Sequence, residues 1–236
     1  MEHTQDVKCV AWHPTEEVSL SVLLYSPISR PHRGPCQSSL NNTVQILASS
    51  SYDDTIKLYI DDPSEDWFCF NTLTGHTSTV WSLAWEPKGR YLASSSEDHT
   101  VRVWKQLSDH RWICALVLEC HERAVYSVSW TAGTRGEERE EGDLGWLAST
   151  GSDGTIHVWE LSVSLSMISL FAFLIPSIVQ ESNSKELEHK LIIRHSSAHG
   201  VNDVNSVVWC QRSGYQDLLA TAGDDGMVRV WRMSKT

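Results

Sequence analysis

Several common sources of catalytic chemistry are missing from this sequence of 236 residues. It holds no glycine-rich phosphate loop, no H-E-x-x-H zinc motif and no G-x-S-x-G nucleophile motif. Its six cysteines are scattered and never form a C-x-x-C pair, which is typical of reduced thiols in an intracellular protein. We therefore expect no enzyme active site, no metal and no cofactor.

Basic residues are also scarce. The chain has 19 Lys and Arg against 30 Asp and Glu, and its formal net charge is −11. A protein that binds the phosphate backbone needs a basic face, so we expect no nucleic-acid partner. No secretory signal opens the chain, because Met1-Glu2-His3 leads at once into an expected strand.

The sequence has one long apolar stretch, at residues 161–180. Its length fits a membrane span. A span here would, however, place two neighbouring strands of one sheet on opposite sides of the bilayer, so we interpret 161–180 as an insertion and expect no membrane association. A second insertion, the proline-containing segment 18–45, lengthens the turn between the first two strands. One hypothesis is that both are retained introns, since each ends in Val-Gln, which a CAG acceptor site can encode.

What the sequence does contain is a segment that recurs. Asp53 and Asp98, His76 and His121, and Trp85 and Trp130 are each 45 residues apart. Each copy holds short runs rich in Val, Leu, Trp and Ser between turn residues, which predicts strands. This period, with His near the start and Trp near the end, is similar to that of WD40 repeats. We expect an all-β WD40 β-propeller with four blades of a ring that normally has seven.

The blades are expected to form one domain over residues 1–236. Their expected ranges are 3–74 with insertion 18–45, 75–119, 120–197 with insertion 161–180, and 198–236. The last blade shows only three strands, so 15 of 16 strands are expected and the ring lacks its closing strand. The simplest interpretation is a chain without its N-terminal blades.

In every copy an Asp lies six residues before the final aromatic residue, and a hydroxyl residue lies four before that Asp. The WD40 resemblance implies that His, hydroxyl, Asp and Trp form a buried tetrad, which must be complete because unpaired buried polar groups are costly. The expected tetrads are His76, Ser94, Asp98 and Trp104; His121, Ser149, Asp153 and Trp159; and Thr221, Asp225 and Trp231 with His199. One extra residue before Trp209 leads us to expect a different position for His199, and Tyr59 deprives the first copy of its indole donor.

The second residue of each innermost strand is expected near the mouth of the central channel. These candidate partner-binding residues are Lys8, Trp81, Tyr126 and Asn205. Exposed Trp and Tyr are good anchors for a protein partner; the alternative is that they pack against the neighbouring blade. The acidic loop 137–141 is expected to be a solvated tip, with docking of a basic partner as the alternative. Cys114, Cys120 and His121 lie close in sequence, but the tetrad role of His121 argues against a metal site.

Several segments are more specific than the repeat. The stretches 48–59, 75–84, 203–205 and 224–226, and the acidic spacer before Trp67, resemble the WD40 subunit of the cytosolic iron–sulfur protein assembly (CIA) targeting complex. The resemblance implies a non-enzymatic adaptor that helps deliver clusters to cytosolic and nuclear apoproteins. Its partners would be the other subunits and client apoproteins, in the cytoplasm, with the nucleus left open. The alternatives are another WD40 adaptor, such as a ubiquitin-ligase substrate receptor, and an enzyme using the Cys and His groups.

Overall fold

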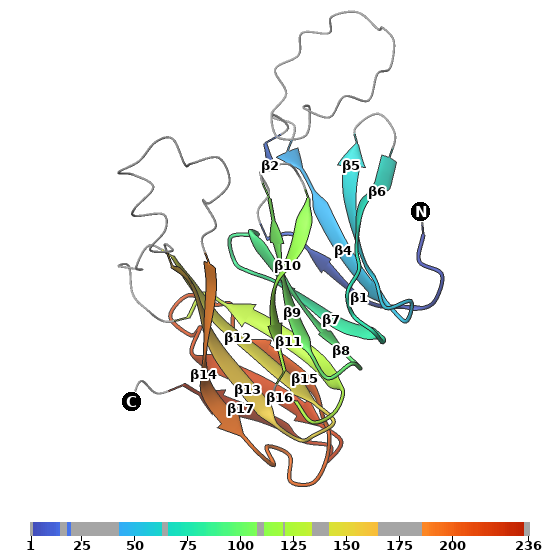
Figure 1. Cartoon of the computed structure of the whole chain (residues 1–236). Coiled ribbons are helices and arrows are strands. Elements are labelled where there is room, and N and C mark those ends of the chain that lie inside the picture. The colour runs from blue at the N-terminus through green and yellow to red at the C-terminus, as the bar shows by residue number, and fades with distance from the viewer. Residues whose placement is uncertain are drawn as a thin grey trace, which may run out of the picture.

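The computed structural model describes residues 2–14, 18–19, 43–62, 66–107, 111–119, 121–133, 142–164 and 186–233. Regular structure in these ranges consists of strands, and four antiparallel sheets hold most of it (Figure 1). The expected all-β fold is confirmed. In the same ranges the structure contains no helix whose length and apolar character would let it cross a membrane.

The four sheets follow one another along the chain. The first contains β1 (Val7–Trp12), β4 (Ile46–Ser51), β5 (Ile56–Asp62) and β6 (Asp66–Leu73). The second contains β7 (Val80–Trp85), β8 (Tyr91–Ser96), β9 (Val101–Gln106) and β10 (Trp112–Leu118). The third contains β11 (Val125–Thr131), β12 (Asp143–Gly151), β13 (Ile156–Ser164) and β14 (Glu186–His195). The fourth contains β15 (Val204–Trp209), β16 (Leu218–Gly223) and β17 (Val228–Arg232).

The turn between the second and third strands of each sheet contains one residue with a left-handed backbone. This residue directly follows the tetrad aspartate, and it is Asp54 (φ 62°), His99 (φ 70°), Gly154 (φ 70°) or Gly226 (φ 73°). Glycine adopts this conformation freely because it has no Cβ, whereas other residues pay a steric penalty. The third and fourth sheets therefore have unstrained turns, and the first and second hold a strained residue at the same point.

Successive sheets pack against each other through their first strands. β7 contacts β1 and β4, β11 contacts β7 and β8, and β15 contacts β11 and β12. Apolar side chains fill these junctions. At the first junction, Val80, Leu83 and Trp85 of β7 share one buried cluster with Ile56 and Leu58 of β5. The hydrophobic core therefore lies between the sheets, and the first and fourth sheets stand at the two ends of the row (Figure 1).

The two predicted insertions are described only at their edges. β13 continues through Ser164, and it pairs Leu161 with His189 and Ser164 with Glu186. The expected start of the second insertion at residue 161 is therefore wrong, because Leu161 is a fully buried core residue of the strand. At the first insertion, β2 (Val18–Ser19) pairs with β3 (Thr43–Val44). Residues 20–42, residues 165–185 and the acidic loop 137–141 lie outside the described residues.

Candidate functional site

A histidine, an aspartate and a hydroxyl residue are hydrogen-bonded in each of the four sheets. In the second sheet, His76 Nδ1 lies 2.7 Å from Asp98 Oδ2, and its Nε2 lies 2.7 Å from Ser94 Oγ. Trp104 Nε1 donates to the same hydroxyl at 2.9 Å. The His76 side chain is 1% exposed and that of Asp98 is 6% exposed. The four residues expected to form a tetrad are in contact here and shielded from solvent.

The third sheet adds a second histidine to this arrangement. His121 Nδ1 lies 2.8 Å from Asp153 Oδ2, and its Nε2 lies 2.6 Å from Ser149 Oγ. The ring of Trp159 is buried 6.5 Å from the His121 ring, centroid to centroid. His157 Nδ1 lies 3.1 Å from His121 Nε2. Burial lowers the pKa of His157 to about 4, and the charge of His121 acts in the same direction, so His157 is neutral at pH 7.

The fourth sheet corrects one expectation. His199 Nδ1 lies 2.7 Å from Asp225 Oδ1, and its Nε2 lies 2.9 Å from Thr221 Oγ1. Trp231 Nε1 donates to the same hydroxyl at 2.9 Å. His199 therefore occupies the same place as its counterparts, and the expected different position is wrong. The turn at residues 196–202 takes up the extra residue before β15 begins.

The first sheet replaces the indole by a phenol. His3 Nδ1 lies 2.8 Å from Asp53 Oδ2, and its Nε2 lies 2.7 Å from Ser49 Oγ. Tyr59 holds the position that Trp104 holds in the second sheet, six residues after the aspartate. Burial raises the pKa of Tyr59 above its usual value, so the phenol keeps its proton at neutral pH. His3 thus bridges Asp53 and Ser49 although the first sheet has no indole at this position.

These carboxylates are held in their charged form. Burial alone would raise the pKa of Asp98, but hydrogen bonds from His76 and Thr100 and the charge on His76 hold it well below its usual range. Asp53 and Asp153 are shifted in the same direction by equivalent bonds. A catalytic triad occurs once in a protein, whereas this arrangement occurs in all four sheets. We therefore assign it to the stability of the fold.

Each of the four predicted partner-binding residues lies at a β-bulge. The register between β1 and β4 skips Lys8. Trp81 is skipped between β7 and β8, Tyr126 between β11 and β12, and Asn205 between β15 and β16. A bulge leaves one residue without an opposite partner in the ladder and re-aims its side chain. The same local geometry thus presents four different side chains at corresponding places.

Three of these bulged side chains meet in a row with Tyr52, which we call the aromatic strip (Lys8, Tyr52, Trp81 and Tyr126). Lys8 Nζ lies 3.8 Å from the centroid of the Tyr52 ring. The Tyr52 and Trp81 centroids are 5.5 Å apart, and those of Trp81 and Tyr126 are 5.8 Å apart with the rings perpendicular. Cation–π and edge-to-face contacts of this kind are attractive, so the strip is held together across three sheets.

Carboxylates border the aromatic strip. Trp81 Nε1 donates to Glu97 Oε2 at 2.8 Å, and the Tyr126 hydroxyl donates to Asp203 Oδ2 at 3.4 Å. Asn205 has no place in the row of rings, and it donates to Asp224 within its own sheet. Lys8 is exposed, and the three rings are half-buried. The rings therefore pack against neighbouring sheets and also keep part of their surface exposed to solvent.

The residues of this site that sequence reasoning missed lie in turns. Tyr52 sits in the turn after β4, and Glu97 sits in the turn after β8. The prediction of anchors rests on the inner strands, and neither residue lies on one. The signal was present in the repeat itself, because Tyr52 and Glu97 occupy the same position, one residue before the tetrad aspartate.

The cysteines form no recognisable metal site in the described part of the chain. Across those residues, no three His, Cys, Asp or Glu side chains are grouped as metal ligands would be. Cys114 is exposed and donates to the carbonyl of Leu116, while His121 is bonded within its tetrad. Cys120, the third member of the cluster considered from the sequence, lies outside the described residues.

Known proteins share both the repeat and the wider sequence. Residues 67–105, 112–160 and 190–232 match the family described as WD domain, G-beta repeat. A Chaetomium globosum protein named probable cytosolic iron-sulfur protein assembly protein 1 is 31% identical over 98% of this chain and 52% of its own length. A relative of the same name from Pyricularia oryzae is 30% identical over 81% of this chain and 51% of its own length. Another from Cryptococcus neoformans is 42% identical over 39% of this chain and 19% of its own length.

The chain spans about half the length of the longest-matching of these relatives. The family match covers more than half of the chain, and it falls on strands of all four sheets. The repeated tetrads, and the left-handed residue that follows each tetrad aspartate, also indicate WD40 repeats. The chain belongs to the WD40 repeat family.

Proposed function

We propose that this chain is a non-catalytic adaptor in cytosolic iron–sulfur protein assembly, and that it docks its partners through the aromatic strip. The observation that carries the proposal is the similarity, along 98% of the chain, to a relative named for that process. The proposed partners are the other subunits of the CIA targeting complex and client apoproteins, in the cytoplasm. None of the three relatives reported above is named as a ubiquitin-ligase subunit.

The geometry of the strip supports docking. Trp and Tyr are the residue types that most often dominate protein–protein binding energy. Trp81 is held by Tyr52, Tyr126 and Glu97, so little side-chain freedom remains to be lost on binding. The carboxylates of Glu97 and Asp203 favour a partner segment that brings a positive group beside an apolar or planar one. Lys8 offers the single cation within the strip.

A pull-down from cytosol with the full chain as bait, read by mass spectrometry, tests the function. The expected result is recovery of proteins that assemble or carry iron–sulfur clusters. Recovery of chaperones alone would contradict the proposal.

Substitutions then test the site. Trp81→Ala and Tyr126→Ala should each reduce recovery of those partners by roughly tenfold or more, as expected for anchors worth about 2 kcal/mol. Tyr215→Ala is the matched control, because Tyr215 is an exposed aromatic residue in the turn between β15 and β16, at the far end of the fourth sheet from Asn205. If all three variants retained the partners equally, the strip would not be the docking surface.

A further inference from the structure

The middle of the aromatic strip combines two rings with two carboxylates. Trp81 lies in β7 and Tyr126 in β11, and each of their sheets has a packed neighbour on both sides. Glu97 accepts a hydrogen bond from the Trp81 indole N–H at 2.8 Å, and Asp203 accepts one from the Tyr126 hydroxyl at 3.4 Å. The two rings are perpendicular, with centroids 5.8 Å apart. We call these four residues the Trp81–Tyr126 site.

The charges of the two carboxylates are uncompensated within the described ranges. No lysine, arginine or histidine in these ranges forms an ion pair with Glu97 or Asp203. Each carboxylate bonds its ring through one oxygen atom, which leaves the other oxygen able to accept a further hydrogen bond. Both charges also act on one phenol, because burial raises the pKa of Tyr126 and the charges of Asp203 and Glu97 act in the same direction. The negative potential of both groups therefore converges on the Tyr126 hydroxyl.

The other half of the aromatic strip shows how these rings accept a cation. Lys8 Nζ lies 3.8 Å from the Tyr52 centroid and 5.7 Å from the Trp81 centroid. Tyr52 and Trp81 form an edge-to-face pair with centroids 5.5 Å apart, much like Trp81 and Tyr126. The strip thus contains two similar ring pairs, of which one meets a lysine of the chain and the other meets two carboxylates. Carboxylates strengthen the attraction of a ring pair for a cation, so the second pair is suited to a cation that a partner supplies.

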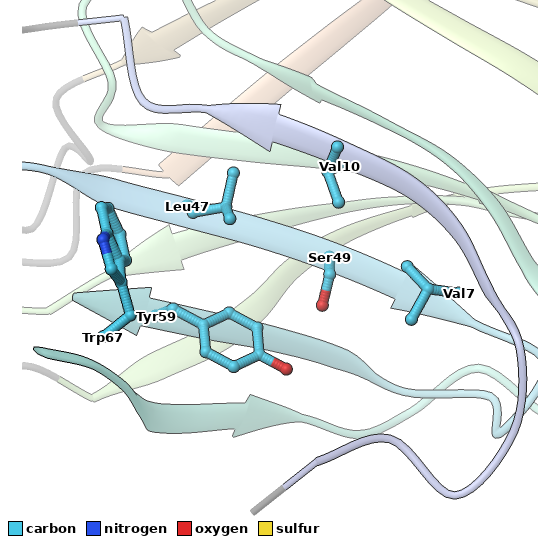
Figure 2. A pocket seen from close by; sticks show the side chains of 6 residues that line it. All are labelled: Val7, Val10, Leu47, Ser49, Tyr59 and Trp67. Carbon is cyan, nitrogen blue, oxygen red and sulfur yellow. The ribbon is translucent and has the colours of Figure 1, made fainter. Parts of the chain in front are cut away.

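The pocket drawn in Figure 2 has a different character. Its volume is about 250 Å³, and it lies on the first sheet. Among the described residues, its lining contains no charged side chain and consists of Val7, Val10, Leu47, Ser49, Tyr59 and Trp67. Transfer of a cation into such apolar surroundings is costly unless a counter-charge accompanies it. A cationic ligand group is therefore expected at the Trp81–Tyr126 site and not in this pocket.

We propose that the Trp81–Tyr126 site binds an arginine side chain of a partner protein, with its guanidinium against the rings and hydrogen-bonded to Glu97 and Asp203. A guanidinium is planar, so it can stack on an aromatic ring while the N–H groups at its edge reach carboxylates. The ammonium of a lysine is compact and more strongly hydrated, so it matches a ring and two carboxylates less well. This inference rests on the proposed docking role of the aromatic strip and names the partner group that the strip recognises.

Titration with a small peptide tests the site directly. The probe is acetyl-Gly-Arg-Gly-amide, and the readout is the indole N–H resonance of Trp81 in NMR spectra of the full chain, assigned through Trp81→Phe. The arginine peptide should shift this resonance to saturation. The same peptide with citrulline keeps the planar shape without the charge, and it should bind roughly tenfold more weakly because it loses the ion pairs with the carboxylates. Equal binding of the two peptides would overturn the proposal, and equal binding of a lysine peptide would overturn the choice of arginine.

Two conservative substitutions separate binding from folding. Glu97→Gln and Asp203→Asn keep an acceptor for the neighbouring ring but remove the charge, so each should weaken binding of the arginine peptide by roughly tenfold. Tm in calorimetry should stay the same or rise, because the two like charges no longer repel each other. Asp224→Asn is the matched control, since Asp224 is exposed, occupies the position of Glu97 in the fourth sheet and accepts a hydrogen bond from Asn205. It should leave the affinity within about twofold. Equal weakening by all three variants would indicate only a general attraction to an acidic protein and would refute the site.

The cytosolic pull-down distinguishes this inference from the proposed function. The bait is the full chain, either wild type or carrying both Glu97→Gln and Asp203→Asn. If the wild type recovers iron–sulfur assembly proteins and the double variant recovers them equally, the adaptor function stands and arginine recognition is refuted. If the double variant loses these partners while its Tm is unchanged, both are supported. If the wild type recovers none of them, the adaptor function fails, and the peptide titration still decides whether the site binds arginine.

Discussion

Removal of the Asp98 carboxylate should destabilise the protein in a measurable way. Asp98→Ala deletes a charged acceptor that lies 2.7 Å from both His76 Nδ1 and Thr100 Oγ1. A hydrogen bond to a charged group contributes roughly 1.5–3 kcal/mol, and a buried partner left unpaired adds roughly 1–3 kcal/mol. Water can reach Thr100, which is half-buried, and so recovers part of that loss. We expect the free energy of unfolding to fall by about 3 kcal/mol, which lowers Tm by about 6–12 °C for a chain of this size.

Urea denaturation at neutral pH, followed by tryptophan fluorescence, measures this change. Glu97→Ala is the matched control, because it removes the same charge from the adjacent residue of the same turn. The Glu97 side chain is exposed and accepts a hydrogen bond from the half-buried Trp81, so its loss should stay within about 1 kcal/mol. Equal losses for Asp98→Ala and Glu97→Ala would refute the assignment of the tetrads to stability.

Three further predictions concern pH and the turns. Stability should fall as the pH drops below about 4. The pKa of Asp98 is lowered in the folded state, so the unfolded state takes up a proton first and is favoured at low pH. Asp98→Ala should flatten this fall, which urea titrations at several pH values measure. The folded pKa of His157 is about 4 against about 6.5 when unfolded, so it should cost stability as the pH falls from 6.5 to 4, and His157→Gln should be less sensitive over that window. Gly226→Ala should lower the free energy of unfolding by about 1–2 kcal/mol, because φ is +73° at Gly226; steric crowding would not contribute, since no neighbouring atom lies within 4 Å of the new Cβ. His99→Gly should raise Tm, because it relieves a left-handed residue at the same point of another turn. Changes of the opposite sign in calorimetry would disprove the turn argument.

The repeated turns and strands were predictable because their signals are local. The spacing of Asp98 and Trp104 is set by one hairpin, and the same hairpin recurs in every sheet. The boundary at Leu161 was not predictable, since a buried strand end and the apolar segment after it have the same composition. The position of His199 was misjudged for a related reason, because a turn can absorb one residue without moving the side chains at either end.

The sequence predicted where the candidate site lies but only some of the residues that form it. The second residue of each inner strand could be singled out from the repeat, and all four prove to be bulged. Which of them touch one another depends on how the sheets pack, and a spacing pattern does not contain that information. Tyr52 reaches Trp81 across a sheet junction, and Tyr126 reaches Asp203 across the next. Such contacts join residues that are 29 and 77 positions apart in the chain.

The bulges also separate what the chain must conserve from what it is free to vary. Each bulged position follows a valine, and Lys, Trp, Tyr and Asn occupy it in the four sheets. Because a bulged residue has no partner in the strand ladder and Lys8 and Asn205 are exposed, substitutions at those two positions should change stability by no more than about 0.5 kcal/mol. A lineage can therefore exchange one recognition side chain for another, sheet by sheet, while the framework that displays them stays the same.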